Sequence, residues 1–275
     1  MTVVVKIGGA RAVDPKGALA DIASLVESGE RVVVVHGGST AVDDTLEAMG
    51  ETPEYVETPG GVVGRFTDER TMDVFSMVLP GKLNTALVVG LQNAGVNAVG
   101  LSGVDGGLLT GPRKGAVRVV EDGKRKIRRG DHSGRIAEVD GDLLETLLDG
   151  GYTPVATVPM LAKDGEEWLA VNSDADRAAA AVAGALGADL VLLTDVPGVL
   201  ADLEDPESVI DRVDSPAAYE ALTEAAEGFM TRKVMAATEG LEGGASSAVI
   251  ADANADAPVS AALGGAGTTI TPDAL

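Results

Sequence analysis

The sequence predicts an α/β fold, a three-layer αβα sandwich with a largely parallel central sheet. Short valine-rich runs alternate along the chain with longer segments of helical periodicity, which is the pattern of repeated βαβ units. With 275 residues, of which 45% are hydrophobic, the chain can bury the core of one large domain. No linker or low-complexity tract divides it, so we expect a single domain over 1–275 with two lobes, 1–165 and 166–275.

The first two predicted strands each end in a pair of glycines. Val3–Ile7 runs into Gly8-Gly9, and Arg31–Val35 runs through a histidine into Gly37-Gly38. Helical periodicity between the two runs makes a βαβ unit, so the strands are parallel and both turns lie at one edge of the sheet. Glycine lets an anion approach the backbone N–H groups there, although glycines after a strand can also serve packing alone. The pair of turns predicts an anion cradle.

Lys6 precedes the first glycine turn by two residues. The interior of a strand seldom buries an unpaired lysine, so we expect this side chain to point into the cradle.

A second group of polar residues precedes an alanine-rich helix that ends near Leu186. Asn172, Asp174 and Asp176 occupy alternate positions there, and we expect Asn172 to cap the helix and the two acids to lie in its first turn. Capping accounts for some of these side chains. At least one remains for another task, such as organising lysines or a metal ion.

The overall charge excludes some classes of function. A net charge of −22 argues against a general nucleic-acid binder, and the excess of 43 acidic over 21 basic residues favours a surface adapted to high salt, with an acidic mesophilic enzyme as the alternative. The sequence has no cysteine and two histidines, which excludes thiolate catalysis and makes a histidine-rich metal site improbable. No run approaches the roughly 18 apolar residues of a membrane helix. We expect a soluble cytoplasmic protein.

One segment reverses the charge of the chain. Residues 113–135 carry three acidic side chains and nine basic ones, namely Arg113, Lys114, Arg118, Lys124, Arg125, Lys126, Arg128, Arg129 and Arg135. Two short strand-like runs flank a turn at 121–124, which predicts a hairpin. A solvated hairpin with ordinary charges is one interpretation. Because the rest of the chain is poor in cations, we favour a docking arm for an acidic partner.

The motifs favour phosphoryl transfer without a covalent nucleophile. The P-loop, the dinucleotide fingerprint, the metalloprotease motif and the nucleophile elbow are all absent. What remains is glycine turns at strand ends and two well-placed lysines, Lys6 and Lys233. Phosphoryl transfer requires little beyond charge neutralisation and alignment of donor with acceptor.

These residues resemble the amino-acid kinase family, and within it the acetylglutamate kinase group. The resemblance covers nearly the full chain and rests on ordered motifs: Lys6-Ile7-Gly8-Gly9, His36-Gly37-Gly38-Ser39, Arg65 before Thr67-Asp68, Asn172 to Asp176, the turn 194–200, and Lys233. It implies the carbamate-kinase-like fold of that family. Ser39 stands where many relatives have a third glycine, which leaves less room near the phosphates.

The resemblance also implies roles for these residues. Lys6 and Lys233 would stabilise the transferring phosphoryl group and Asp176 would orient the two lysines, so these three are the candidate catalytic residues. ATP would be the donor, with Mg²⁺ held mainly through its phosphates and no protein metal ligand assigned. The remaining candidate residues are those for the substrate, Gly37, Gly38, Arg65 and Asn172, and those for the nucleotide and its phosphates, Gly8, Gly9, Thr194, Asp195 and Gly198.

The stretch 59–68 and the basic segment resemble a subgroup that phosphorylates glutamate or 2-aminoadipate linked to a small acidic LysW-type carrier protein in arginine and lysine biosynthesis. Its carrier would dock on Arg113, Lys114, Arg118, Lys124, Arg125, Lys126, Arg128 and Arg129. The alternatives are an N-acetylglutamate kinase with a free substrate and, less favoured because both lysines are intact, a non-catalytic amino-acid sensor. We expect a homodimer that binds neither nucleic acid nor a membrane.

Overall fold

The computed structural model describes residues 1–8, 15–61, 63–121, 123–205 and 207–275, with the backbone alone of Glu121. Its α-helices are α1 (Pro15–Glu27), α2 (Ser39–Ala48), α3 (Glu69–Met77), α4 (Asn84–Asn93), α5 (Gly141–Asp149), α6 (Ala175–Leu186), α7 (Pro216–Ala225), α8 (Phe229–Glu242) and α9 (Pro258–Leu263). A π-helical turn, η1 (Val78–Leu83), joins α3 to α4, and short 3₁₀ turns are η2 (Asp105–Gly107) and η3 (Pro272–Ala274).

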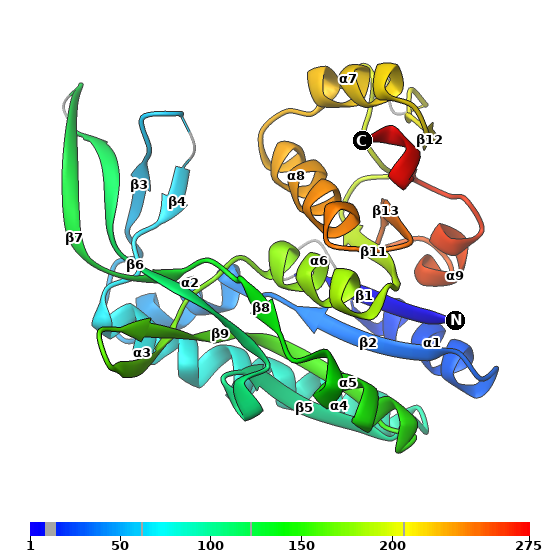
Figure 1. Ribbon diagram of the computed structural model, residues 1–275, viewed down its shortest axis with the longest axis horizontal. Coiled ribbons are helices and arrows are strands. Elements are labelled where there is room, and N and C mark those ends of the chain that lie inside the picture. The colour runs from blue at the N-terminus through cyan, green and yellow to red at the C-terminus, as the bar shows by residue number, and fades with distance from the viewer. Residues whose placement is uncertain (9–14, 62, 122, 206) are drawn as a thin grey trace.

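A large sheet forms the centre of the molecule, with β12-β14-β13-β11-β1-β2-β9-β6-β7 as its main path (Figure 1). Strands β5 and β10 also pair with β9, and β8 pairs with β6. The strand bounds are β1 (Thr2–Ile7), β2 (Arg31–His36), β5 (Ala98–Gly103), β6 (Leu109–Glu121), β7 (Lys124–Gly134), β8 (Glu138–Val139), β9 (Thr153–Asp164), β10 (Glu167–Val171), β11 (Asp189–Thr194), β12 (Arg212–Val213), β13 (Ser247–Asp252) and β14 (Thr268–Ile270).

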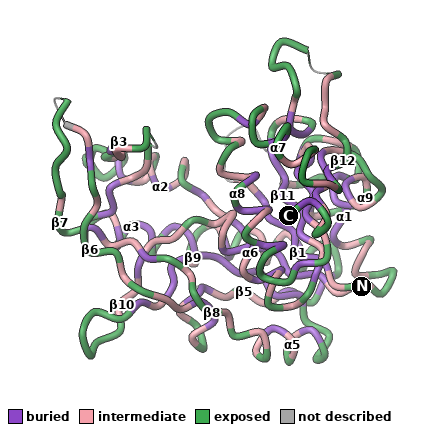
Figure 2. Tube along the Cα trace, turned by 45° about the horizontal axis from the view of Figure 1, so that its top comes forward, coloured by how far each residue is buried: buried purple, intermediate pink, exposed green. Residues whose placement is uncertain are grey.

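The sheet is largely parallel, as the sequence predicts. Strand β1 pairs in parallel with β2 and β11, and the parallel pairing continues outward to β9 and β13. Helices cover both faces, so the central strands are buried on both sides and their valine runs carry no polar alternation. Figure 2 shows these strands as the buried centre of the molecule.

The alternation of side chains along β1 decides where Lys6 points. Val3, Val5 and Ile7 belong to the apolar cluster that packs under α1, α4 and α9, whereas Val4 belongs to the cluster on the α6 and α8 side. Successive side chains of a strand point to opposite faces, so Lys6 lies on the same face as Val4. Its ammonium group therefore meets α6 and α8.

Two hairpins stand on one side of the sheet. Strands β6 and β7 extend well beyond their neighbours, and β3 (Tyr55–Glu57) and β4 (Val63–Arg65) form a separate two-stranded sheet beside them (Figure 1). A small apolar cluster of Val56, Phe66, Val117 and Val119 packs the two hairpins together. The basic hairpin of the sequence analysis is thus real and longer than the two short runs predicted.

Helix α3, the turn η1 and α4 form one continuous helix, which corrects two sequence-based predictions. The sequence predicts two separate helices, one that starts near Thr67 and one over about 81–94, with Pro80 between them. A π-helical turn instead accommodates this proline, and the Asn84 N–H donates to the Leu79 carbonyl five residues back. The run Glu69–Asn93 is also long and apolar enough to cross a membrane by length and composition alone, and 33% of its apolar window is buried within the chain. The expectation that no segment approaches that length was wrong.

Candidate active site

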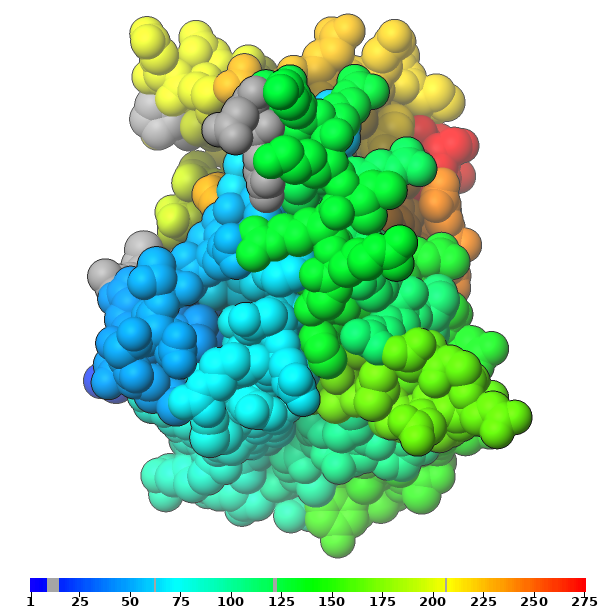
Figure 3. Space-filling model, turned by 90° about the vertical axis from the view of Figure 1, so that its left-hand side faces the viewer, coloured from blue at the N-terminus to red at the C-terminus, as the bar shows by residue number. Residues whose placement is uncertain are grey.

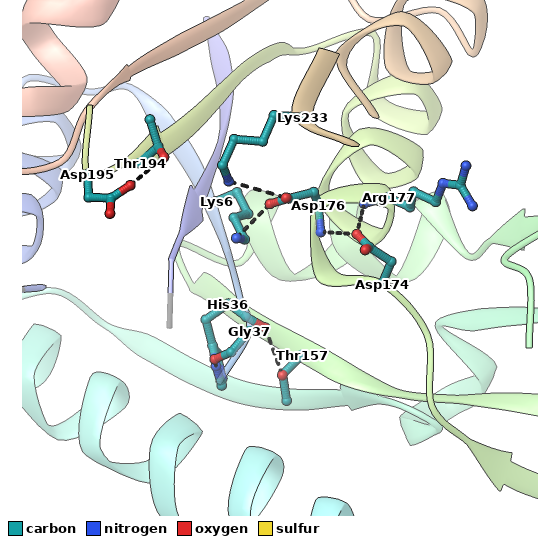
Figure 4. A network of polar contacts seen from close by, with 10 residues as sticks. All are labelled: Lys6, His36, Gly37, Thr157, Asp174, Asp176, Arg177, Thr194, Asp195 and Lys233. Carbon is teal, nitrogen blue, oxygen red and sulfur yellow. Dashed lines mark hydrogen bonds and ion pairs between the residues drawn. The ribbon is translucent and has the colours of Figure 1, made fainter. Parts of the chain in front are cut away.

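Two lysines and an aspartate from three elements meet at the carboxyl end of β1 (Figure 4). Lys6 Nζ lies 2.6 Å from Oδ1 of Asp176, and Lys233 Nζ donates to Oδ2 of the same carboxylate at 3.2 Å. The three side chains are 8%, 14% and 13% exposed, in the order Lys6, Asp176, Lys233. The sequence-predicted catalytic residues therefore form one buried cluster with a net charge of +1.

The local sequence explains how Asp176 reaches the lysines. The side chain of Asp174, not that of Asn172, caps α6 by accepting from the N–H groups of Asp176 and Arg177 at 2.9 and 3.1 Å. This corrects the prediction that Asn172 is the cap. Because Asp174 satisfies the free amides of the first turn, the Asp176 carboxylate is released to face β1 and α8.

The charges of the cluster shift one another's titration. Burial alone would raise the pKa of Asp176, but the positive charges of Lys6 and Lys233 outweigh it and hold the pKa at about 2. Burial lowers the pKa of Lys233, and repulsion from Lys6 adds to that effect while Asp176 opposes it. At neutral pH the carboxylate is ionised and screens two lysines that would otherwise repel each other.

The two glycine turns adjoin, as expected from the parallel register. Ile7 pairs with His36, and the Gly37 N–H donates to the Ile7 carbonyl at 3.5 Å, which places Gly8 next to the second turn. Gly9 lies outside the described residues. A Cβ on Gly38 would lie 2.2 Å from Leu83 Cδ1, so a larger residue at this point would have to displace side chains of the continuous helix.

His36 holds the second turn as a neutral imidazole. Its Nδ1–H donates to the Gly37 carbonyl at 3.0 Å and its Nε2 accepts from Asn84 Nδ2 at 3.1 Å. Burial lowers the pKa of His36 to about 4, and the charge of Lys6 adds to the effect although the bond to Gly37 opposes it. Thr157 donates to the His36 carbonyl at 2.9 Å, so the turn is tied to β9 as well. No motif in the sequence marks Asn84 or Thr157 as part of the site.

Arg65 is more enclosed than the sequence suggests. Its guanidinium forms an ion pair with Asp43, donates to the Tyr55 hydroxyl at 2.8 Å and to the Ser39 carbonyl at 3.2 Å, and lies over the rings of Tyr55 and Phe75. Burial would raise the pKa of Asp43, but the bonds from Arg65 and Tyr55 lower it overall. An acceptor carboxylate at Arg65 would therefore share the guanidinium with Asp43.

Asn172 contacts Thr67, which follows Arg65 along the chain. Its Nδ2 donates at 3.0 Å to Oγ1 of Thr67, which is fully buried and follows Arg65 by two residues. The structure thus brings both predicted substrate residues to the base of the β3–β4 hairpin. Thr67 itself was named in the motif but given no role.

The turn after β11 is the third predicted part of the site. Thr194 is buried and donates to the exposed Asp195 carboxylate at 3.2 Å. Gly198 is buried in the C-terminal part, where a Cβ would lie 2.8 Å from Thr268 Oγ1, so packing against β14 requires glycine there. Among the described residues, no group of three or more metal-ligating side chains gathers.

The basic residues of the β6–β7 hairpin divide into two faces. Directly paired residues of an antiparallel ladder share a face, so Val119, Lys126 and Arg128 lie toward β3–β4, whereas Arg118, Ile127, Arg125 and Arg129 lie on the outer face. Arg128 forms an ion pair with Glu54 and lies 4.0 Å from the centre of the Phe66 ring. Arg113 is likewise paired, with Asp164.

Comparison with known proteins gives the family. The model of the amino acid kinase family matches residues 1–252. The chain belongs to this family. It is 44% identical to a LysW-aminoadipate kinase of Deinococcus radiodurans over 98% of this chain and 91% of that protein, and 44% identical to one of Thermus thermophilus over 98% and 99%.

An acetylglutamate kinase of Methanopyrus kandleri is 43% identical over 90% of this chain and 93% of that protein. Among solved structures, an N-acetylglutamate synthase of Neisseria gonorrhoeae superposes with a TM-score of 0.74 and 27% identity, covering 98% of this chain and 59% of that one. Identity alone therefore does not separate carrier-linked from free substrates for this family member, and the choice depends on the chain's own surface.

Proposed function

We propose that this protein transfers the γ-phosphoryl group of ATP to the side-chain carboxylate of glutamate, 2-aminoadipate or both, with the substrate's amino group linked to a small acidic carrier of the LysW type. The product is an acyl phosphate for arginine or lysine biosynthesis. The observation that carries this proposal is the coexistence of the Lys6–Asp176–Lys233 cluster with a basic outer face on the β6–β7 hairpin. The first supplies kinase chemistry, and the second supplies a landing surface for an acidic protein.

In the proposed reaction an oxygen of the substrate carboxylate forms a bond to the γ-phosphorus while the bond from that phosphorus to the ADP oxygen breaks. Lys6 and Lys233 neutralise charge on the phosphoryl oxygens, and the amides of Gly8 and Gly38 donate to them, because the Gly37 N–H already donates to the Ile7 carbonyl. Mg²⁺ would add charge neutralisation through the ATP phosphates, which fits a described site whose nearest carboxylate, Asp176, is already bound by two lysines. No covalent enzyme intermediate is required.

The nucleotide is assigned to the part of the chain after about residue 165, the second lobe of the sequence analysis. Lys233 approaches the cluster from α8 of this part, and the Thr194–Asp195 turn lies on the same side (Figure 4). The substrate is assigned to Arg65 and Thr67 of the first lobe, together with Asn172, which starts the second lobe and donates to Thr67. Transfer then takes place between the lobes, at the carboxyl ends of β1 and β2.

The outer face of the basic hairpin is the proposed carrier surface. Arg118, Arg125 and Arg129 are exposed there around Ile127, which is 66% exposed, so the face combines cations with one apolar contact. Figure 3 shows the hairpin as a ridge on its side of the molecule. Arg113 and Arg128 were predicted to dock the carrier, but their ion pairs with Asp164 and Glu54 assign them to holding the hairpin in place. Lys114, Lys124 and Lys126 are also exposed and remain candidate contacts, although Lys126 lies on the face toward β3–β4 and not on the outer face.

The decisive experiment traps the acyl phosphate as a hydroxamate at high KCl, with carrier-linked glutamate, carrier-linked aminoadipate and free N-acetylglutamate as acceptors. We expect activity on the carrier-linked acceptors. Strong activity on free N-acetylglutamate alone would make the protein an acetylglutamate kinase, the candidate that the Methanopyrus relative favours. Inactivity with ATP on every acceptor would leave the amino-acid sensor as the function.

A charge-reversal pair tests the carrier surface separately. Arg125→Glu with Arg129→Glu should raise KM for a carrier-linked acceptor by about tenfold or more, because two cations become repulsive toward an acidic protein. The matched control is Arg70→Glu with Arg212→Glu, two exposed arginines on α3 and β12. Equal losses in the two double variants, or an equal loss on free N-acetylglutamate, would reject the docking face.

We also propose that two copies associate through the continuous helix α3–η1–α4. Met77 and Val89 are 51% and 52% exposed on it, and Lys82 is the one charged residue between 74 and 93 in a chain that is 23% charged. An apolar exposed helix face of this length fits a second copy of itself better than solvent or an acidic partner. Val89→Glu should convert the dimer to a monomer by light scattering, whereas the control Leu203→Glu, at another exposed apolar position, should not. A dimer unaffected by Val89→Glu would contradict this interface.

The composition further supports a cytoplasmic protein adapted to high salt. With a net charge of −22, the carboxylates of the surface repel one another at low ionic strength and are screened in concentrated salt. The Tm should therefore rise as KCl increases toward molar concentrations. A Tm that is independent of KCl would favour the acidic mesophilic alternative.

A further inference from the structure

A buried carboxylate lies at the base of β7, away from the lysine cluster. Asp131 is 4% exposed, and no basic side chain in the described part of the chain forms an ion pair with it. Burying a carboxylate without a cation is costly unless hydrogen bonds satisfy it. Its Oδ1 accepts from the Thr67 N–H at 3.1 Å, and its Oδ2 accepts from the Ser133 hydroxyl. The phosphoryl-transfer chemistry does not use the Asp131 carboxylate, so its burial indicates another role.

The partners of Asp131 connect it to the substrate side of the site. Thr67 is held at three atoms: its N–H by Asp131, its carbonyl by the His132 N–H at 2.6 Å, and its Oγ1 by Asn172 Nδ2 at 3.0 Å. The Asn172 N–H in turn donates to the His132 carbonyl at 2.8 Å. Residues 131–134 of β7 are thus fastened to Thr67 on one side and to Asn172 on the other.

This arrangement controls both predicted substrate residues. Arg65 precedes Thr67 by two residues, so fixing the Thr67 backbone fixes the end of β4 that carries the guanidinium. An Asn amide offers two N–H groups and a carbonyl oxygen, and Thr67 Oγ1 takes one N–H, which fixes the amide plane and leaves the other groups for a ligand. Strand β7, which carries Asp131, is also part of the basic hairpin and includes Gly130 and Arg129.

We propose that Asp131 is a positioning residue for the acceptor substrate. Its carboxylate fixes Thr67, and Thr67 orients the Asn172 amide and the Arg65 segment toward the acceptor, so that the base of the hairpin and the substrate site move as one unit. The inference rests on the proposed function, since it concerns the acceptor of that reaction. It assigns no contact between Asp131 and the substrate.

The test is a steady-state comparison of acceptor and ATP kinetics for Asp131→Asn. The variant preserves volume and removes the charge. KM for the acceptor should rise about tenfold, the effect of losing one hydrogen bond to a charged group, while KM for ATP stays within twofold. A purely structural role would lower the folded, active fraction, which reduces kcat and leaves both KM values unchanged. The control is Asp105→Asn, because Asp105 also accepts from an N–H and a hydroxyl, those of Ser102 at 2.7 and 2.9 Å, and takes no part in the contacts that hold Thr67 and Asn172.

A second pair of variants keeps the proposal testable if Asp131→Asn does not fold. Thr67→Val removes the acceptor of the Asn172 bond and should raise KM for the acceptor to a similar extent, whereas Thr67→Ser should restore it. Acceptor KM unchanged in Asp131→Asn or in Thr67→Val, with active wild-type enzyme, would overturn this inference and leave the proposed function intact. A wild-type enzyme inactive on all three acceptors would instead overturn the proposed function, and the inference with it.

Discussion

Lys6 Nζ lies 2.6 Å from the carboxylate of Asp176, and both side chains are almost closed off from solvent. The strand β1 brings the lysine from its carboxyl end and α6 brings the aspartate from its first turn, so the pair joins the sheet to the helix. Because Lys233 binds the other oxygen of Asp176, removing this carboxylate leaves two buried ammonium groups facing each other.

Asp176→Asn should therefore lower kcat by about 100-fold or more and also reduce stability at neutral pH. The folded-state pKa of Asp176, about 2, lies below its ordinary value of 3.8, so its ionised form stabilises the fold above pH 4 by on the order of 2 kcal/mol. This contribution is lost as the pH falls from about 4 through 2. The difference in Tm between wild type and variant should be constant from pH 5 to 8 and shrink below pH 4. A difference that does not change with acid would contradict this assignment.

Lys6→Ala and Lys233→Ala should each reduce kcat by about 100-fold or more while KM for both substrates changes by only a few-fold, since the lysines stabilise charge that develops in the transition state. Lys163→Ala, at an exposed lysine on β9, is the control. Losses confined to KM would assign the two lysines to ground-state binding instead.

We expect the protonation state of Lys233 to determine the fall of kcat/KM at alkaline pH. Burial and the nearby Lys6 lower its pKa below that of an ordinary lysine, and the deprotonated amine carries no charge for the phosphoryl group. The kcat/KM value, which reports the free enzyme, should therefore fall at a pH below 10.5. Lys233→Arg, which keeps its charge throughout this range, should lack that limb even if its activity is lower.

The short-range features of the fold were predictable from the sequence. The valine runs and glycine turns identified β1, β2 and the cradle, because strands buried on both faces need no polar alternation and a backbone that binds anions needs glycine. The direction of the Lys6 side chain was predictable as well, because side chains alternate between the two faces of a strand and the neighbouring valines define those faces. The role of Asp176 came from family resemblance, since capping and lysine binding both account for an acid in a first helical turn.

The long-range pairings were not predictable. Arg128 reaches Glu54 across 74 positions and Asp131 reaches Thr67 across 64, and no local pattern marks such partners. The sequence analysis assigned Arg128 to the docking of a carrier and assigned no role to Asp131. Pro80 led to a wrong prediction of a helix end, because a proline, which has no N–H, normally ends a helix. Here a π-helical turn allows the helix to continue past it.

The buried neutral His36 should make the folded protein less stable as the pH falls through about 5. The unfolded imidazole takes up a proton below about 6.5, whereas burial holds the folded pKa at about 4, so the unfolded state binds more protons between these values. The contribution of His36 should lower the free energy of unfolding by about 3 kcal/mol as the pH drops from 6.5 to 4, and this contribution should not change further below pH 4. His36→Gln should remove this contribution, which is measured as the pH dependence of the difference in urea unfolding free energy between the two proteins. Parallel pH curves would show that His36 is not buried neutral.

Gly38 predicts that the continuous helix sets the shape of the phosphate cradle. A Cβ there would lie 2.2 Å from Leu83 Cδ1 and 2.8 Å from Leu79 Cδ2, and Leu79 is fully buried, so the leucine side chains, the turn or the helix must shift. Gly38→Ala should cost about 1–3 kcal/mol of unfolding free energy and lower kcat by about 10- to 100-fold through the displaced amides.

The matched control for Gly38→Ala is Gly17→Ala, where an added Cβ meets nothing within 4 Å on α1 and should stabilise the fold slightly. Leu83→Ala makes room beside residue 38, so the double variant Gly38→Ala/Leu83→Ala should recover part of the lost kcat relative to Gly38→Ala alone, although Leu83→Ala by itself opens a cavity. Additive losses in the double variant would mean that the glycine serves the ligand directly. Recovery would instead identify the clash with the helix as the reason that position 38 is glycine.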